Sequence, residues 1–245
     1  NVHGQYLSYG VLNVFNADGD GGHDFENGWD WARMPGATAV HYPIAEVDGR
    51  PHARQFNSKT FVGGVELNNQ FGLFAMDFED APFPNQPHSP LSAKKSWFFF
   101  GDRVVALGSG ITRSADACDV ESTLFQTKLE DGSATTKGDW LTDAVGNGYY
   151  VPEGQNLMVT NGVQKSRGHG DEMATAGEYV TAVINHGVSP QGALYEYVVC
   201  PGAESKGNVA DSYNVIQQND AAHIVEDLRS GTIAAALFSG FKTTG

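Results

Sequence analysis

The chain has 245 residues, of which 40% are hydrophobic and 11% aromatic, so it is long enough to bury a sizeable core and is not a disordered segment. Its formal net charge of −14 excludes a nucleic-acid-binding surface, because such surfaces need an excess of Lys and Arg to displace counterions from phosphates. No apolar run approaches the roughly 18 residues that predict a transmembrane helix. The first ten residues have neither an initiator Met nor the pattern of a signal peptide, which is expected of a mature or internal piece of a longer protein.

The first regular pattern lies close to the N-terminus. Leu7, Val11, Val14 and Phe15 have the spacing of one face of a short helix. The sequence therefore predicts a short helical lead-in.

From Ala39 onward, the pattern changes to short strands separated by turns. Apolar runs end again and again at Gly, Pro, Asn or Asp, and the chain contains 30 glycines and 10 prolines. Gly101 and Asp102 lie between two apolar runs, as in a hairpin. The run ALYEYVVC, residues 193–200, alternates as a strand with one buried face does. These features predict an all-β fold of antiparallel strands.

Two irregular regions interrupt this pattern. The first, residues 79–95, contains four prolines, which do not suit a central strand. The second, residues 200–220, is predicted to include one short helix from Val209 to Gln217. There is no internal repeat and no linker that divides the chain further.

The segment DGDGGHD is the first candidate for a metal site. It includes Asp18, Asp20, His23 and Asp24, and hard cations such as calcium prefer clustered carboxylates. The EF-hand pattern fails, because Gly and Trp stand where that loop needs a fifth-position ligand and a final Glu. A calcium site of another kind and a solvated acidic turn both stay open, and no zinc spacing is found elsewhere.

Cys118 and Cys200 are the only cysteines and lie far apart in the sequence. One disulfide is possible, and the sequence does not decide whether it forms. Free, buried cysteines are the favoured prediction.

The segment GWDWARMPG is the first candidate for carbohydrate binding. Trp29, Trp31 and Arg33 share one face if the segment is extended, and aromatic rings beside a guanidinium are suited to a sugar ring and its carboxylate or sulfate. The alternative is that both tryptophans fill a core and that Arg33 pairs with Asp30 or Glu26. The sequence leaves both interpretations open.

The segment GGVELNNQFG is the second polar cluster. Glu66, Asn68, Asn69 and Gln70 follow two glycines between apolar runs, and they are positioned to project a carboxylate and amides from a sheet edge into a cleft. Such groups can hold a carboxylic acid through hydrogen bonds. The alternative is that the two asparagines simply form a turn.

Several strings together resemble the polysaccharide lyases of family 8, the chondroitin and hyaluronan lyases. They cover nearly the whole chain in order: GWDWARMPGATAVHYP (28–43), FVGGVELNNQFGLFAMDF (61–78), AKKSWFFFGDRVVALGSGI (93–111), ESTLFQ (121–126), GDWL with GNGYYV (138–151), ALYEYVVCPG (193–202) and HIVEDL (223–228). The resemblance implies a large antiparallel β supersandwich similar to the galactose-mutarotase-like fold. It places the end of a preceding helical region and a linker at residues 1–27, and the central β-sandwich domain at residues 28–245.

The resemblance also implies a chemistry and a partner domain. Family members cleave acidic glycosaminoglycans by β-elimination at the uronic acid, and an upstream α/α toroid supplies the catalytic His, Tyr and arginines. Glu66, Asn68 and Asn69 are then the candidate catalytic residues of this chain, and Trp29, Trp31 and Arg33 are the candidate substrate-binding residues. No cofactor is required, although a divalent cation such as calcium is possible.

The resemblance further implies a secreted or periplasmic bacterial protein. His3, Tyr6 and Tyr9 do not match the family's catalytic His and Tyr, which lie much further upstream. Two other functions stay open: a non-catalytic carbohydrate-binding or scaffolding module that uses the tryptophans, and a mutarotase-like epimerase, for which the sequence offers no distinct His and Glu pair.

Overall fold

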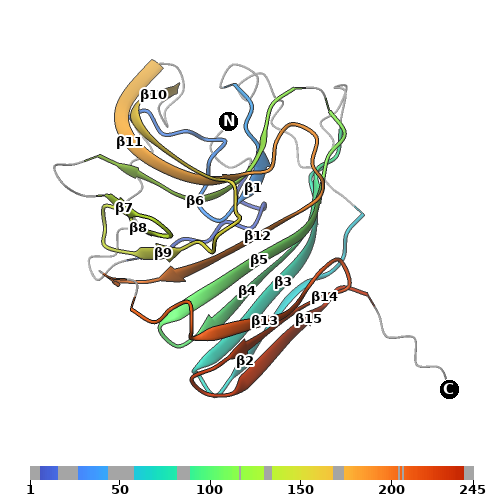
Figure 1. Ribbon diagram of the computed structural model, residues 1–245. Coiled ribbons are helices and arrows are strands. Elements are labelled where there is room, and N and C mark those ends of the chain that lie inside the picture. The colour runs from blue at the N-terminus through green and yellow to red at the C-terminus, as the bar shows by residue number, and fades with distance from the viewer. Residues whose placement is uncertain are drawn as a thin grey trace.

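The computed structural model describes residues 6–15, 27–43, 58–81, 89–115, 117–129, 134–167, 174–203, 205 and 207–239. Within these residues the fold consists of strands and contains no helix. The strands form three sheets in which neighbouring strands pair antiparallel, and the largest sheet is the middle layer (Figure 1). The predicted all-β, antiparallel supersandwich is confirmed.

The middle layer is an eight-stranded sheet. Its strands from one edge to the other are β2 (Val62–Leu67), β3 (Phe71–Glu79), β4 (Ser92–Phe100), β5 (Arg103–Thr112), β12 (Gln191–Cys200), β9 (Gly148–Tyr150), β8 (Trp140–Thr142) and β7 (Thr135–Lys137). The predicted hairpin turn at Gly101 and Asp102 joins β4 to β5, since Phe100 lies opposite Arg103.

The two outer layers are smaller sheets. The four-stranded sheet has the order β1 (Thr38–Val40), β6 (Val120–Lys128), β11 (Ala174–Asn185) and β10 (Leu157–Arg167). The three-stranded sheet has the order β13 (Tyr213–Gln218), β14 (Ala222–Asp227) and β15 (Thr232–Leu237).

The central strands of the middle sheet are buried on both faces, which explains their long apolar runs. In β5, Val104 and Ala106 belong to the core shared with the four-stranded sheet, whereas Val105 and Leu107 belong to the core shared with the three-stranded sheet. Side chains on a strand alternate between faces, so one strand supplies both cores. We call the face that meets the four-stranded sheet the upper face.

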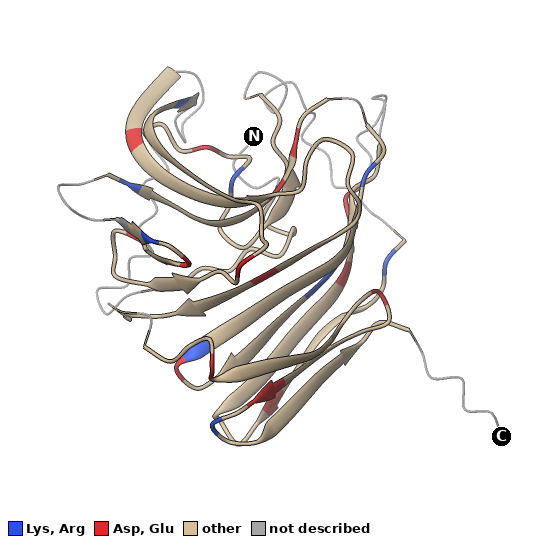
Figure 2. Cartoon of the chain, viewed as in Figure 1, with Lys and Arg blue, Asp and Glu red and all other residues tan. Residues whose placement is uncertain are grey.

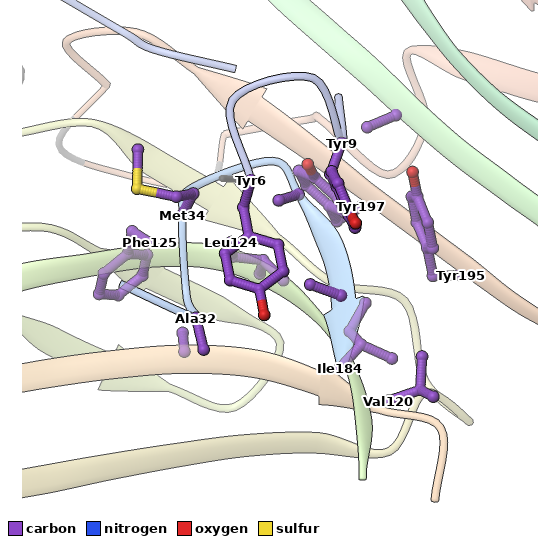
Figure 3. Packing of buried hydrophobic residues seen from close by; sticks show 14 of the residues in the cluster. Tyr6, Tyr9, Ala32, Met34, Val120, Leu124, Phe125, Ile184, Tyr195 and Tyr197 are labelled. Carbon is purple, nitrogen blue, oxygen red and sulfur yellow. The ribbon is translucent and has the colours of Figure 1, made fainter. Parts of the chain in front are cut away.

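The N-terminal lead-in, residues 6–15, packs onto the upper face without forming a helix. Residues 6–10 form a turn, and Gly10 has a left-handed φ of 85° that ends any helical run. Tyr6 and Tyr9 are inserted into the core (Figure 3). Lys95 is fully buried, and its Nζ donates hydrogen bonds to the backbone oxygens of Tyr9 at 2.7 Å and Gly36 at 2.8 Å. The predicted short helix is therefore wrong for these residues.

The second predicted helix, from Val209 to Gln217, is also wrong. The backbone N–H of Ser212 donates to the oxygen of Val209 at 3.0 Å, which closes a turn, and Tyr213 then begins β13. Pairing with β14 decides this conformation, because a local pattern of nine residues is too short to fix a helix against tertiary contacts.

A buried histidine fixes the three-stranded sheet to the middle sheet. His223 of β14 is fully buried, and its Nδ1 and Nε2 lie 2.7 Å from Ser96 Oγ and 2.9 Å from Ser109 Oγ. Burial lowers the pKa of His223 to about 4. The imidazole therefore joins β4, β5 and β14 as an uncharged group at neutral pH.

Candidate functional site

The GWDWARMPG segment is folded into the protein. Trp29 and Trp31 are 0% and 2% exposed, and the ring of Trp29 packs edge-on against Tyr179 of β11 at 6.2 Å between centroids. Gly28 has a φ of 82°, and a Cβ there would overlap the backbone of Gly177. Because no ring face is accessible in this conformation, the burial supports the core interpretation of both tryptophans. Their role in substrate binding stays a prediction, and the low exposure of the two side chains does not support it.

Arg33 is held by a buried carboxylate. Its Nε and Nη2 donate to the two carboxylate oxygens of Glu121 at 2.8 and 2.9 Å, which is the bidentate geometry that Arg favours. The sequence suggested Asp30 or Glu26 as partners. Asp30 lies further away, at 3.8 Å from Arg33, and Glu26 is outside the described residues. The guanidinium is thus engaged with protein rather than presented to a ligand.

Gln126 fixes the same segment from β6. Its Nε2 donates to the backbone oxygens of Asp30 at 2.8 Å and Arg33 at 2.9 Å, and its Oε1 accepts from the Asp30 N–H at 3.1 Å. Glu121 and Gln126 are five residues apart, so simple alternation would put them on opposite faces. A β-bulge at Leu124, which has no partner in the register with β11, restores them to one face.

His41 and Asp30 form the exposed part of this network. His41 Nε2 lies 2.8 Å from Asp30 Oδ2. Burial by itself would lower the pKa of His41, but its hydrogen bond to Asp30 and the charges of Asp30 and Glu121 raise it above 6.5. Burial would likewise raise the pKa of Asp30, but His41, followed by Arg33, brings it below 3.8. The pair is therefore charged on both sides around pH 6.

The GGVELNNQFG segment has the opposite character. All six residues of β2 are exposed, and the chain reverses at Asn68 and Asn69 before β3 begins. Both asparagines have left-handed φ angles, 57° and 54°, and the Gln70 N–H donates to the Leu67 oxygen at 3.2 Å. Asn tolerates this conformation better than most residues, so the pair does form the turn.

The turn also fixes the candidate carboxylate. The backbone N–H of Asn69 donates to Oε1 of Glu66, and the N–H of Gly101, in the next hairpin, donates to the oxygen of Gln70 at 3.2 Å. Glu66, Asn68 and Asn69 therefore lie together at one exposed hairpin tip. Their catalytic role stays a prediction.

The two groups of candidate residues do not form one site. Trp29 packs against Tyr179 of β11 and Arg33 binds Glu121 of β6, both in the four-stranded sheet, whereas Glu66 belongs to β2 at the edge of the eight-stranded sheet. Figure 1 shows β2 in a different layer from β6 and β11. Glu121 and Gln126, which bind the tryptophan segment, were not among the residues predicted from the sequence. The sequence carried a signal for them, because both belong to the string ESTLFQ.

The metal and cysteine predictions have different outcomes. Asp18, Asp20, His23 and Asp24 lie outside the described residues, so the calcium prediction stays a prediction. In the described part of the chain, no group of three or more His, Cys, Asp or Glu side chains could hold a metal ion. Both cysteines are free, as favoured, but only Cys200 is buried and Cys118 is half-buried.

Charges are dispersed over the surface. In the described part of the chain, Figure 2 shows acidic and basic residues scattered over the three sheets rather than gathered in one basic stripe. None of the described elements is a helix that could span a membrane. The structure is an antiparallel β supersandwich with an exposed hairpin at one edge, whose tip is polar.

The sequence identifies the family of this supersandwich. Residues 1–212 match the model of polysaccharide lyase family 8, super-sandwich domain, and the chain belongs to that family. The match ends immediately before β13, where the three-stranded sheet begins. The predicted family is confirmed, and its members include enzymes that degrade polysaccharides.

Two relatives and one structure describe the likeness. A chondroitin sulfate ABC exolyase of Proteus vulgaris is 32% identical over 99% of this chain and 26% of that protein. A hyaluronate lyase of Staphylococcus aureus is 28% identical over 94% of this chain and 30% of that protein. A chondroitin AC lyase of Streptomyces coelicolor A3, in complex with chondroitin sulphate, shares the fold with a TM-score of 0.74 at 24% identity, over 99% of this chain and 34% of that one. The chain thus spans about a quarter to a third of the length of these proteins.

Proposed function

We propose that this chain is the β-sandwich part of a glycosaminoglycan lyase that cleaves chondroitin sulfate or hyaluronan by β-elimination at the uronic acid. Membership of family 8 and the names of the relatives support the reaction class. The observation that carries the proposal is the exposed tip of the β2–β3 hairpin, where the turn itself holds the carboxylate of Glu66.

β-Elimination makes three demands on an enzyme. The C5 proton of the uronic acid is removed, the C4–O bond breaks as the C4=C5 double bond forms, and the leaving oxygen takes up a proton. Negative charge that builds on the uronate carboxylate must be stabilised at the same time. Amides and arginines suit that stabilisation, whereas His or Tyr suits the proton transfers.

In the proposed enzyme, the β domain provides one wall of the cleft. Glu66 orients the catalytic groups of the facing wall, and its position is fixed because the Asn69 N–H binds one of its oxygens. The side-chain amides of Asn68 and Asn69 are available to hydrogen-bond the substrate from the same tip. A helical α/α toroid upstream in the chain is proposed to supply the His, Tyr and arginines that carry out the remaining steps.

This division of labour agrees with the charge of the β domain. A surface with a net charge of −14 does not attract a polyanion by itself. The proposed helical domain therefore carries the basic groove. We further infer a location outside the cytoplasm, secreted or periplasmic, because the proposed substrate is an extracellular polymer. The proposed steps use acid–base groups and require no cofactor, and calcium binding by residues 18–24 stays a separate prediction.

The test measures whether an unsaturated uronate forms, and its ultraviolet absorbance is the readout. The protein is expressed with the upstream helical region and incubated with chondroitin sulfate and with hyaluronan. We expect activity in the parent, and a loss of about a hundredfold in kcat for Glu66→Gln with an unchanged melting temperature, since groups that support proton transfer contribute roughly this much. Glu226→Gln, on β14 of the three-stranded sheet, is the matched control and should keep full activity. An inactive parent would refute the lyase assignment, and a fully active Glu66→Gln variant would remove the hairpin from the site.

A non-catalytic carbohydrate-binding module is the second function left open by the sequence. It relied on Trp29, Trp31 and Arg33 as the contact surface, and the first two are buried while Arg33 is paired with Glu121. No observation in the structure favours this function over the lyase.

A further inference from the structure

Two phenylalanines on the upper face of the middle sheet are exposed where a core would be expected. Phe74 of β3 is 39% exposed and Phe99 of β4 is 37% exposed. Their neighbours on the same face, Trp97 and Val104, are 3% and 8% exposed and belong to the upper core. The cover provided by the four-stranded sheet and the lead-in therefore ends between these residues.

Glycines beside both rings leave them open. In the register of the sheet, Gly72 lies opposite Phe99 and Gly64 lies opposite Phe74. A Cβ at Gly72 would stand 3.5 Å from the Phe99 side chain, in ordinary contact with it, so a larger side chain there would extend over the ring. A Cβ at Gly64 would stand 3.5 Å from the Phe74 ring but only 2.8 Å from the backbone oxygen of Leu73, so the backbone also requires glycine at this position. Gly72 thus keeps the Phe99 ring accessible, and Gly64 leaves space beside Phe74.

The rings lie directly beside the candidate carboxylate. Glu66, Gly72 and Phe99 are successive partners across β2, β3 and β4, so the side chains of Glu66 and Phe99 point from the same face. Phe74 follows on that face two residues along β3, and its ring contacts Trp97 at 5.7 Å between centroids. The two rings and the carboxylate thus form one row of groups on one surface.

The same face continues beyond the rings. Val62 lies opposite Met76, two residues beyond Phe74. From Glu66 to Val62 the strand covers about 13 Å, which is long enough for more than one sugar ring.

Charge restricts what can bind over the rings. The charged side chain in their row is Glu66, which repels a carboxylate or a sulfate. Lys59 and Lys94, the lysines at the other end of this hairpin, both pair with Asp77, at 3.5 and 2.6 Å. An uncharged ring with an apolar C–H face suits an exposed aromatic ring beside a hydrogen-bond acceptor.

We propose that Phe74 and Phe99 form a stacking subsite for the uncharged N-acetylhexosamine ring of the polysaccharide, next to Glu66. The choice of polysaccharide rests on the proposed function, whereas the subsite itself rests on the register and exposure of these residues. The hexosamine of hyaluronan satisfies the charge requirement, because it carries an acetamide and no acidic group.

Phe61 provides a matched control on the same hairpin. Its exposure, 40%, is nearly that of the two proposed residues, but it precedes Val62 and so points from the lower face, where its ring packs against Phe238 at 5.4 Å. Leucine replaces phenylalanine in each variant, because it keeps an apolar side chain and removes the flat ring.

The experiment titrates the 245-residue chain with a hyaluronan tetrasaccharide by calorimetry and NMR at 0.15 M salt, where repulsion by the net charge of −14 is screened beyond about 8 Å. We expect Phe74→Leu with Phe99→Leu to weaken binding about tenfold, which corresponds to ~1.4 kcal/mol, with the melting temperature and fold retained. Phe61→Leu should bind as the parent does. Gly72→Leu, which covers the Phe99 ring, should weaken binding in the same way.

Three results would overturn the subsite: no binding by the parent, equal binding by the double variant, or an equal loss in Phe61→Leu. If the parent is instead a dimer that the double variant dissociates, the face is a contact between copies. Failure of the subsite and failure of the lyase proposal can be told apart. If binding depends on the rings but the longer protein yields no unsaturated uronate, the lyase proposal is wrong and the subsite stands. If the double variant of the longer protein is active with an unchanged KM, the subsite is wrong and the lyase proposal stands.

Discussion

The segments GWDWARMPG and GGVELNNQFG look alike in sequence and differ in the folded protein. Both combine glycines, charged or amide side chains and large apolar residues. Trp29 of the first is fully buried, and Arg33 is bound by Glu121. In the second, every residue of β2 is exposed, and the carboxylate of Glu66 accepts a hydrogen bond from the backbone N–H of Asn69 in its own turn.

The difference lies in the partners that the fold supplies. The tryptophan segment meets β6 and β11, which provide a carboxylate, an amide and an aromatic ring for its polar and apolar groups. The β2–β3 hairpin is at a sheet edge. There β2 has a neighbouring strand on one side only, and its residues are exposed on both faces. Substitutions in the first segment should therefore change stability, and those in the second should change binding or turnover. Four predictions test this contrast.

The largest effect is expected for Trp29→Ala. Removing a fully buried indole leaves a cavity beside Tyr179, and the free energy of unfolding should fall by about 4 kcal/mol. Denaturant titration measures this loss. Ile233→Ala, at a residue that is 59% exposed on β15, is the control and should change stability by less than about 0.5 kcal/mol. Similar losses in the two variants would contradict the assignment of Trp29 to the core.

The second effect is expected for Glu121→Ala. It leaves the Arg33 guanidinium, whose side chain is 15% exposed, without its bidentate partner, so unfolding should become easier by about 3 kcal/mol. The double variant Arg33→Met with Glu121→Leu should lose less than Glu121→Ala alone, because no unpaired charge stays behind. Together with the single variants Arg33→Met and Glu121→Leu, the double variant completes a double-mutant cycle, which measures the coupling free energy between the two side chains. Purely additive losses would show that the pair is not coupled.

A smaller, pH-dependent effect is expected for His41→Gln. The folded pKa of His41 lies above 6.5, so the native state binds its proton more tightly than the unfolded chain. The stabilisation is complete below pH 6.5 and disappears as the pH rises through the raised pKa. Its size should be at most about 1 kcal/mol, because the pair is partly exposed. Unfolding measured from pH 5 to 9 should show parent and variant converging at high pH, and a constant difference would contradict the assignment.

The smallest effect is expected at the hairpin tip. Asn68→Gly should leave stability nearly unchanged, because glycine adopts a φ of 57° freely, whereas Asn68→Ala should cost about 1 kcal/mol through backbone strain alone. Thermal unfolding compares the two variants. Equal stability of Ala and Gly would show that the turn relaxes. Any loss of turnover in Asn68→Gly would then report the amide and not the turn.

Much of the fold could be predicted from local pattern. The alternation in residues 193–200 holds only in the first half of the strand, where Tyr195 and Tyr197 are buried and Leu194 is 48% exposed; from Val198 to Cys200 both faces are buried, because the strand there meets both cores. Both predicted helices failed, because spacing over so few residues is a weak signal that tertiary contacts override. Near the N-terminus, Tyr9 and Gly36 are fixed by Lys95 instead, and nothing in the sequence around Lys95 indicates that contact.

The candidate site was predicted in part. The composition of GGVELNNQFG indicated a polar cluster at a sheet edge, and the two asparagines occupy the turn that their side chains favour. Whether Trp29 and Trp31 face solvent could not be predicted, since aromatic residues serve cores and binding surfaces equally well. The register across β2, β3 and β4, which sets Phe99 beside Glu66, is a property of strand pairing and not of any single segment.

By itself, the sequence determined the strand-rich class, the family and the position of most turns, because these depend on residue types and on spacing along the chain. Only the tertiary structure decided which polar residues are paired and which are available. The bulge at Leu124 brings Glu121 and Gln126 to one face, and the end of the upper core leaves Phe74 and Phe99 uncovered. Pairing and exposure arise from contacts between strands that are distant in the chain, and those contacts are set by the packing of the three sheets.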